Sequence, residues 1–265
     1  MSQLTAISRE QFADKTWRRY TSYAFAATSN LLPVTVVELT RLVPAMPLGL
    51  VQTENTFQLM AITSLQPGAN LFVAPNGSWI GAYIPAVVRA YPFQLAKPQD
   101  RKESVLCFNS SSGLLGETGE GEAFFDADGP SPAIKEIMNF LSETETSRAL
   151  TQRLVDALQA AGLIQPWPLN LQQGEQTVPV QGLFRIDEEA LNALPDDELL
   201  DLRKTGALPL AYGQLFSMNQ LMILQQAAVA QAKIQEQLQA QAMKQTPSAA
   251  DIGFRFPEGE SLKFS

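Results

Sequence analysis

Long stretches with helical periodicity dominate the second half of the chain and constrain its fold more than any other feature. After Pro132, apolar residues recur at helical spacing: Ile134, Ile137, Met138, Leu141, Leu150, Leu154, Val155 and Leu158. We expect this helix to stop at Gly162, because glycine readily takes the left-handed conformation that ends many helices. From Leu210 to about Lys244 the chain consists mainly of Ala, Gln, Leu and Met, which are good helix formers. The pattern predicts a mostly helical second half with a long C-terminal helix.

A further helix is expected between these two. Asp187 can cap its start, and Glu188 and Glu189 fall in its first turn, where carboxylates interact favourably with the helix dipole. Gly206 and Pro209 are expected to interrupt it.

Short runs with β-strand character occupy most of the first half. Residues 46–65 contain two β-prone runs around the polar pair Glu54 and Asn55, which is a hairpin pattern. Three more runs are expected to form strands: residues 71–74, 93–95 and 103–108. A second hairpin is expected around Gln173 and Gly174. The sequence therefore predicts an α+β protein, with short antiparallel strands and hairpins in its first half and mostly helices in its second.

These elements divide the chain into portions of one composite domain. We expect a mainly β portion over residues 1–109 and a flexible loop rich in Gly, Glu and Ser over residues 110–130. The glutamates in that loop would repel a phosphate group, so the loop does not fit a phosphate cradle. A mainly helical portion is expected over residues 131–244, with the second hairpin near residues 167–186. Residues 245–265 are expected to form a tail that carries Phe254, Phe256 and Phe264.

The charge balance disfavours anionic partners. The chain has 19 Lys and Arg residues and 27 Asp and Glu residues, a formal net charge of −8. Because such a chain repels phosphate backbones, we expect no nucleic-acid binding. No stretch approaches the roughly 18 uncharged apolar residues that a membrane-spanning helix needs, so we expect no membrane span. The first residues lack the apolar core of a secretion signal, and the cytoplasm is the simplest expected compartment.

The chain has no histidine and one cysteine. This excludes Ser-His-Asp and Cys-His catalytic arrangements and every metal site that uses histidine. A thiolate zinc site needs several cysteines, so only a hard cation with oxygen ligands stays compatible with the sequence. We expect neither a metal nor a cofactor. Cys107 lies in an apolar, strand-like run and is predicted to be a small buried side chain.

The stretch GSWIGAYIPAVVRAYPF gathers rings and prolines around a single charge, Arg89. A guanidinium among rings can bind a carboxylate or stack on a ring. The candidate binding residues are therefore Trp79, Tyr83, Arg89 and Tyr91. Alternatively, Arg89 satisfies backbone carbonyls or an acidic side chain in a buried structural joint, with Trp79, Tyr83 and Phe93 as its core. We favour this structural interpretation, because burying large rings stabilises the fold more than one exposed contact does.

One acidic turn resembles part of a calcium-binding loop. Asp126 and Asp128 have the right alternation, but the first and twelfth ligand positions of such a loop would fall on Phe124 and Lys135. We therefore expect an ordinary turn that leads into the next helix, with Ser131 as the helix cap.

Three blocks, in their order and spacing, carry a resemblance to a known family: SWIGAYIPAVVRAYPFQL, FFDADGPSPAIKEIMNFL and FRIDEEALNALPDDELLDLRKTGALPLAYGQLFSMNQL. Over about Pro44 to Leu224 the chain resembles the SapC family of bacterial proteins. The family name implies a link to a surface layer. Some members carry peptide transport permease labels, which a chain without a membrane span contradicts. The family is also associated with genes for flavin-dependent halogenase-like proteins and outer-membrane receptors, and it implies no catalytic residue set.

Two functions are compatible with these observations. The first is a non-catalytic binding or interaction protein of the SapC type, linked to surface-layer or outer-membrane-associated functions. The alternative is an enzyme, or an accessory subunit that works beside a flavin-dependent halogenase-like protein. The absence of histidine and of any nucleophile or phosphate motif favours the first. The expected partner is another protein or a second copy of the chain, bound through the C-terminal helix.

Overall fold

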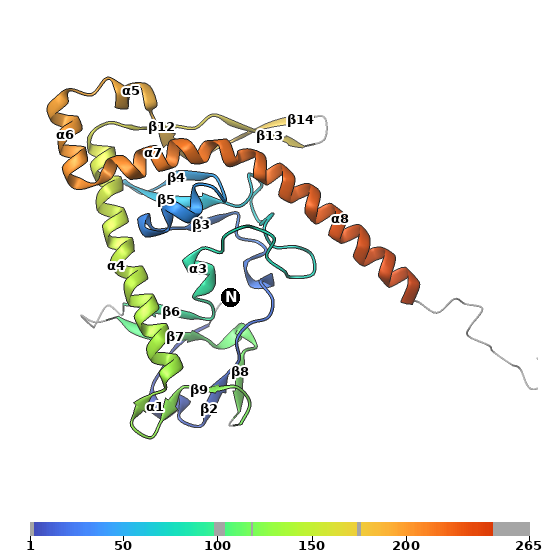
Figure 1. The fold of residues 1–265 in the computed structure, drawn as a ribbon. Helices are drawn as coiled ribbons and strands as arrows, with labels where there is room; N and C mark the ends of the chain where they lie inside the picture. The colour runs from blue at the N-terminus through green and yellow to red at the C-terminus, as the bar shows by residue number, and fades with distance from the viewer. Residues whose placement is uncertain (1–2, 98–103, 118, 174–175, 246–265) are drawn as a thin grey trace, which may run out of the picture.

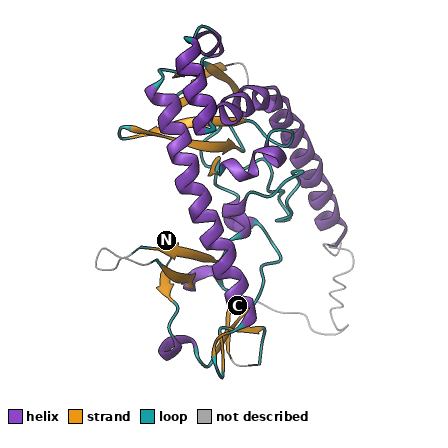
Figure 2. Cartoon of the chain, turned by 60° about the vertical axis from the view of Figure 1, so that its left-hand side comes forward, coloured by secondary structure: helices purple, strands orange, loops and turns teal. Residues whose placement is uncertain are grey.

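The computed structural model describes residues 3–97, 104–117, 119–173 and 176–245, and it has the predicted α+β architecture (Figure 1). Its strands gather in an upper and a lower region, joined by the long helix α4, Pro132–Ala160 (Figures 1 and 2). The C-terminal helices α7, Ala207–Ser217, and α8, Leu221–Gln245, run past the upper region.

The upper region is built on a five-stranded antiparallel sheet in the order β12–β15–β4–β5–β3. In that order the strands are Ile164–Pro166, Leu183–Ile186, Leu48–Thr53, Thr56–Ile62 and Leu31–Pro33. The predicted first hairpin is confirmed as β4–β5, and Glu54 takes a left-handed φ of 55° at its turn. The predicted second hairpin is confirmed as β13, Leu169–Gln173, with β14, Gln176–Val180.

The lower region contains two three-stranded antiparallel sheets, β1–β7–β6 and β8–β2–β9. The first comprises Leu4–Ala6, Val105–Asn109 and Phe93–Ala96, so the strands expected near residues 93–95 and 103–108 are present. The second comprises Leu115–Glu117, Lys15–Trp17 and Glu122–Ala123. A two-stranded hairpin follows: β10, Phe125–Asp126, and β11, Gly129–Pro130.

Two segments in the first half of the chain differ from their predicted structure. Residues 110–130, predicted as a loop, contain strands β8 to β11, which are too short to produce a periodic pattern in the sequence. Residues 71–74, predicted as a strand, make only an isolated bridge between Val73 and Trp79, because Asn76 and Gly77 turn the chain directly after them.

Helix α4 belongs to both hydrophobic cores of the protein. Ser131 caps it as predicted, with its hydroxyl accepting a hydrogen bond from the Ile134 amide at 3.4 Å, and Gly162 follows its end with a φ of 70°. Near its start, Ile134 and Leu141 pack into the lower core, and near its end Leu154, Val155 and Leu158 pack into the upper core. Each such buried aliphatic side chain contributes about 1.5–3 kcal/mol, so α4 fixes the two regions against each other.

The short helices surround these cores. They are α1, Arg9–Phe12; η1, Ala24–Ala26; η2, Val36–Glu38; α2, Leu39–Leu42; α3, Ala86–Arg89; and η3, Ser110–Ser112. The segment from Glu188 to Gln220 adds α5, Glu188–Asn192; α6, Asp196–Thr205; and η4, Met218–Gln220, together with α7.

The predicted cap and one of the two predicted breaks in this segment are confirmed. The Asp187 carboxylate accepts a hydrogen bond from the Ala190 amide at 3.1 Å, and Gly206 ends α6 with a φ of 83°. Pro209 was expected to interrupt the helix, but it lies in the first turn of α7. A proline is tolerated there because the first-turn amides have no helical partner to lose.

Helix α7 is joined to the sheet by buried polar side chains, and α8 leaves the body after a last polar contact. The fully buried Gln214 accepts a hydrogen bond from the Ile186 amide at 2.9 Å and donates one to the Leu48 carbonyl at 3.0 Å. Gln231 of α8 donates to the carbonyls of Asn70 and Val73. Beyond this point α8 extends away from the other elements (Figure 1). The expected tail lies outside the described residues.

Candidate ligand-binding site

Helix α3 is a single turn that separates two hollows of the surface. Val87, Val88 and Tyr91 line the hollow on one side. Arg89 lines two adjoining hollows on the other side. The turn follows Pro85, whose extended backbone precedes the first helical residue, Ala86. The aromatic–proline stretch therefore presents different side chains to two separate places.

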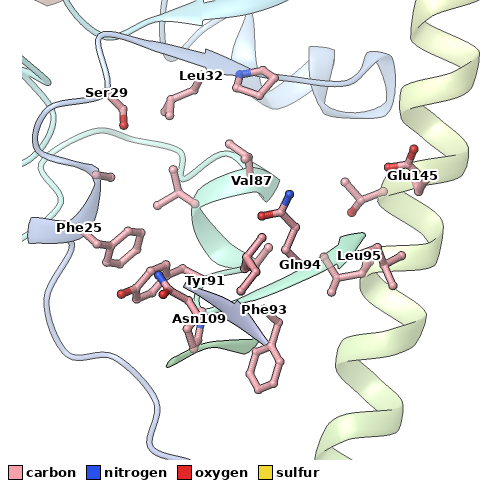
Figure 3. A pocket seen from close by; sticks show the side chains of 18 of the residues that line it. Phe25, Ser29, Leu32, Val87, Tyr91, Phe93, Gln94, Leu95, Asn109 and Glu145 are labelled. Atoms are coloured by element: carbon pink, nitrogen blue, oxygen red, sulfur yellow. The ribbon is translucent and has the colours of Figure 1, made fainter. Parts of the chain in front are cut away.

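The larger hollow, which we call the Tyr91 cavity, has a volume of about 680 Å³ and lies between the upper and lower cores (Figure 3). Side chains from η1, β3, α3, β6 and α4 line it. The apolar part of the lining includes Phe25, Leu32, Val87, Tyr91, Leu95 and Leu141. Its volume falls within the range of about 300–1,000 Å³ that is typical of small-molecule sites.

An aromatic pair closes one end of the Tyr91 cavity. The rings of Phe25 and Tyr91 stack with centroids 3.7 Å apart and planes 7° from parallel. Tyr20 packs edge-on against both rings. Burial raises the pKa of the Tyr91 phenol above its usual range, because it disfavours the charged form.

Polar side chains lie across the middle and the far end of the cavity (Figure 3). Gln94 projects into it between Val87 and Tyr91, and no hydrogen bond of its amide occurs among the described residues. At the α4 end, Arg148 and Glu145 form an exposed ion pair with a separation of 3.5 Å. The cavity therefore combines an aromatic end with amide and charged groups.

The buried carboxylate of Glu38 holds the start of α3 in place through hydrogen bonds. Glu38 is only 5% exposed, and its Oε1 accepts hydrogen bonds from the Ala86 amide at 2.7 Å and the Tyr83 hydroxyl at 3.0 Å. Its Oε2 accepts from both the amide and the hydroxyl of Thr35, each at 3.0 Å. Burial and the neighbouring Glu38 carboxylate raise the pKa of Tyr83, because both oppose a second negative charge. Burying a carboxylate requires such partners, and all four are present.

Glu38 was not predicted as a site residue, although the sequence contains a signal for it. Thr35 and Glu38 have the spacing of a capping box, in which the two side chains bond each other's backbone amides at a helix start. Gln94 and Phe25 were also missed, because nothing in their local pattern shows that they share a cavity. Thr151 of α4 receives a hydrogen bond from the Val36 amide at 2.8 Å, which joins the same capped turn to α4.

The four candidate binding residues do not form one site. Tyr91 lines the Tyr91 cavity, whereas Trp79, Tyr83 and Arg89 line a hollow of about 350 Å³ on the other side of α3. Phe93 is buried in the lower core, as the structural interpretation predicts, and Trp79 and Tyr83 are half-buried against the upper core.

Arg89 is exposed, so its predicted burial is wrong. Its predicted bond to a backbone carbonyl is confirmed, since Nε donates to the Ile84 carbonyl at 3.1 Å. The guanidinium stays at the surface because it lies over the rings of Tyr83 and Phe140 instead of entering either core. Its head remains accessible to a ligand.

The remaining sequence expectations are resolved locally. Cys107 is buried as predicted, and burial raises the pKa of its thiol. Asp126 and Asp128 form the turn between β10 and β11, where the Asp126 carboxylate accepts a hydrogen bond from the Asp128 amide.

Within the described residues, no group of three or more His, Cys, Asp and Glu side chains is placed to hold a metal ion. No helix in this part of the chain is long and apolar enough to cross a membrane.

Comparison with protein families identifies the family of this chain. The SapC family model matches residues 7–224, which is most of the chain. The chain belongs to the SapC family. The match includes every residue named above for the Tyr91 cavity, and of the residues that line the cavity only Leu4 lies outside the matched range. Searches of curated proteins and of solved structures found no match to this chain.

Proposed function

We propose that this SapC protein is a non-catalytic binding protein that holds a small amphipathic molecule in the Tyr91 cavity. The observation that carries the proposal is the position of the cavity between two cores joined by α4. Ligand sites favour such junctions, because neither core fills the space between them. The stacked rings of Phe25 and Tyr91 suit an apolar or planar part of the ligand.

The polar lining indicates what else the ligand carries. The amide of Gln94 offers one acceptor and two donors inside the cavity. Arg148 and Glu145 are each about half exposed and paired at 3.5 Å, a weak ion pair that a ligand can replace at low cost. A molecule with an apolar body and hydroxyl, amide or carboxylate groups matches this lining.

The residue types around the cavity support binding without catalysis. Neither cysteine nor histidine lines it, and the chain has no histidine at all. Glu145 is the one carboxylate among the lining residues described here, and it is paired with a cation. General acid–base catalysis commonly uses two positioned groups, which this lining does not supply.

The fluorescent probe anilinonaphthalene sulfonate, an aromatic anion, tests the proposal. We expect it to bind the wild-type protein saturably, and we expect Gln94→Trp to weaken binding by about tenfold or more, because an indole occupies the middle of the cavity. Gln52→Trp is the matched control, since Gln52 is exposed on β4 and does not line the cavity. Equal binding by the wild type and Gln94→Trp, with unchanged melting, would exclude the Tyr91 cavity as the site.

The exposed apolar side chains of α7 and α8 support a second role, which is contact with another copy of the chain. Phe216, Met222 and Val229 are 62%, 69% and 52% exposed, which is high for large apolar side chains. On α8, Met222, Val229, Lys233 and Glu236 recur at spacings that share one helical face. In an antiparallel pair of these helices, Lys233 would lie opposite Glu236 of the second copy. In the same register Val229 would lie opposite Ala240 of the second copy, so the charges and one apolar contact match.

The cellular compartment of the protein and its link to the surface layer are predictions from the sequence. We propose that the protein resides in the cytoplasm, and recovery of most of it in membranes washed at high salt would contradict this. The surface-layer and outer-membrane connections that the family implies are likewise proposals. Loss of surface-layer protein from a deletion strain, restored by the wild type and not by Gln94→Trp, would link them to the Tyr91 cavity.

A further inference from the structure

A second hollow, on the opposite side of α3, gathers aromatic rings and two arginines. It has a volume of about 350 Å³, and we call it the two-arginine hollow. Tyr23, Trp79 and Tyr83 supply its rings, and Arg41 and Arg89 supply its charges. Its lining shares no residue with that of the Tyr91 cavity, so it is a separate site.

Neither arginine is neutralised by a carboxylate among the described residues. The ion pairs of this part of the chain involve Arg19, Arg148 and Lys204 instead. Arg41, exposed on α2, makes no hydrogen bond or ion pair there. Arg89 is held by the Ile84 carbonyl and a long 3.4 Å contact to the Tyr83 hydroxyl, so most of its five N–H donors remain available.

The lining of the two-arginine hollow carries a charge opposite to that of the whole protein. The formal net charge is −8, yet no carboxylate lines the two-arginine hollow. The neighbouring Glu38 already accepts four hydrogen bonds and is buried, so it offers little to either guanidinium. Two unpaired cations that converge on one hollow attract an anion, and a guanidinium binds a carboxylate through two parallel hydrogen bonds.

The rings are held in place for a planar group. The Trp79 indole donates a hydrogen bond to the Tyr83 carbonyl at 3.0 Å, and its ring lies 5.8 Å from that of Tyr23. Gly81 permits this arrangement, because a Cβ there would meet the Trp79 Nε1 and the Phe72 ring at 2.8 Å. The indole is thus fixed before any ligand arrives, which lowers the entropy cost of binding.

We propose that the two-arginine hollow binds a small aromatic carboxylate, with its carboxylate between Arg41 and Arg89 and its ring against the aromatic side chains. A monoanion fits better than a phosphate dianion, because Glu143 lines the adjoining hollow beside the same two arginines and repels a second charge. The volume of the hollow suits a ligand with a single ring.

Benzoate is the probe, and neutral benzamide of the same shape is the control ligand. Binding is followed by NMR of the ¹⁵N-labelled protein, in which the arginine Nε signals report on the guanidinium groups directly. We expect saturable shifts of the Arg41 and Arg89 signals with benzoate and about tenfold weaker binding of benzamide. Arg41→Gln and Arg89→Gln should each weaken benzoate binding by about tenfold or more, since each removes a charged partner.

Arg41→Gln is the variant least expected to disturb folding, because Arg41 makes no hydrogen bond or ion pair within the described residues that its loss would break. Arg148→Gln, in the Tyr91 cavity, is the matched control and should leave benzoate binding unchanged. The proposal is overturned if benzamide binds as tightly as benzoate, if Arg148→Gln rather than Arg41→Gln weakens binding, or if phenyl phosphate binds more tightly than benzoate. It is also overturned if benzoate shifts neither arginine signal.

Discussion

The ring of Phe25 lies flat on the ring of Tyr91, with centroids 3.7 Å apart, although 65 residues separate the two positions in the chain. Phe25 belongs to η1, which packs on the upper core, and Tyr91 lies two residues before β6 of the lower sheet. The stacked pair therefore connects the two regions on the side of the Tyr91 cavity that faces away from α4 (Figure 3).

Removing this pair is expected to weaken both stability and probe binding. Tyr91→Ala should lower the free energy of unfolding by about 1–3 kcal/mol, because it removes a stacked contact and a partly buried ring. It should also weaken binding of anilinonaphthalene sulfonate, measured by fluorescence titration. Tyr212→Ala is the matched control, since Tyr212 stacks on Phe216 at the surface of α7. If both variants bind the probe equally well, the ring of Tyr91 is not part of the binding wall.

Glu38 is expected to be critical for the position of α3. Glu38→Ala should lower the free energy of unfolding by at least about 2–3 kcal/mol, because it strands the buried amides of Thr35 and Ala86. Glu143→Ala, at an exposed position on α4, should change it by less than about 0.5 kcal/mol. Denaturant unfolding measures both values. Similar values for the two variants would contradict the role assigned to the Glu38 carboxylate.

Alkaline pH is expected to destabilise the protein through its tyrosines. Burial raises the pKa values of Tyr20, Tyr83 and Tyr91 above the usual value of about 10. Because the folded pKa exceeds the unfolded one, the stabilising contribution is complete below about pH 10 and is lost as the pH rises through the folded values. The free energy of unfolding should therefore fall above about pH 10, and a constant value up to about pH 11 would argue against these raised pKa values.

Residue-specific titration separates the two causes that raise the pKa of Tyr83, which are burial and the charge of Glu38. Glu38→Gln should lower the pKa of Tyr83, because it removes the negative charge next to the hydroxyl. The pKa of Tyr91 should stay where it is, since burial alone raises it. NMR of ¹³C-labelled tyrosine measures both values, and a shift at Tyr91 alone would be inconsistent with the network around Glu38.

Self-association through α8 is expected in solution. We expect the wild-type protein to sediment as a dimer in analytical ultracentrifugation and Val229→Glu to shift it toward the monomer, because the added carboxylate disrupts the apolar contact. Ala228→Glu is the control and should leave the dimer intact. Residue 228 is exposed on a neighbouring face of the helix, so its carboxylate would lie outside the interface. A monomeric wild type at all accessible concentrations would rule out this interface.

The sequence predicts the fold where patterns are long or carry strong local signals. The periodicity after Pro132 and the polar pair at Glu54 and Asn55 each correspond to the observed element. Strands β8 to β11 escape prediction because two or three residues cannot display a period. Whether a proline breaks a helix depends on its position, and Pro209 is tolerated because it lies in the first turn of α7.

The candidate site is predicted less completely, because it depends on contacts between distant segments. Tyr91 and Arg89 were identified from one local stretch, but local sequence does not show that α3 directs them to opposite sides. Phe25 and Arg41 approach that stretch only through the tertiary fold. Arg89 was expected to be buried because its neighbours are apolar, whereas a single helical turn is enough to point it to the surface.

Native mass spectrometry tests most directly the central claim, that the Tyr91 cavity binds a small molecule. The wild-type protein and Gln94→Trp are each incubated with the small-molecule fraction of the cells that produce the protein, and the complexes are weighed intact. We predict that the wild type retains one small molecule of defined mass per chain and that Gln94→Trp, folded to the same melting temperature, does not. Retention of the same molecule by both proteins, or by neither, would contradict the claim.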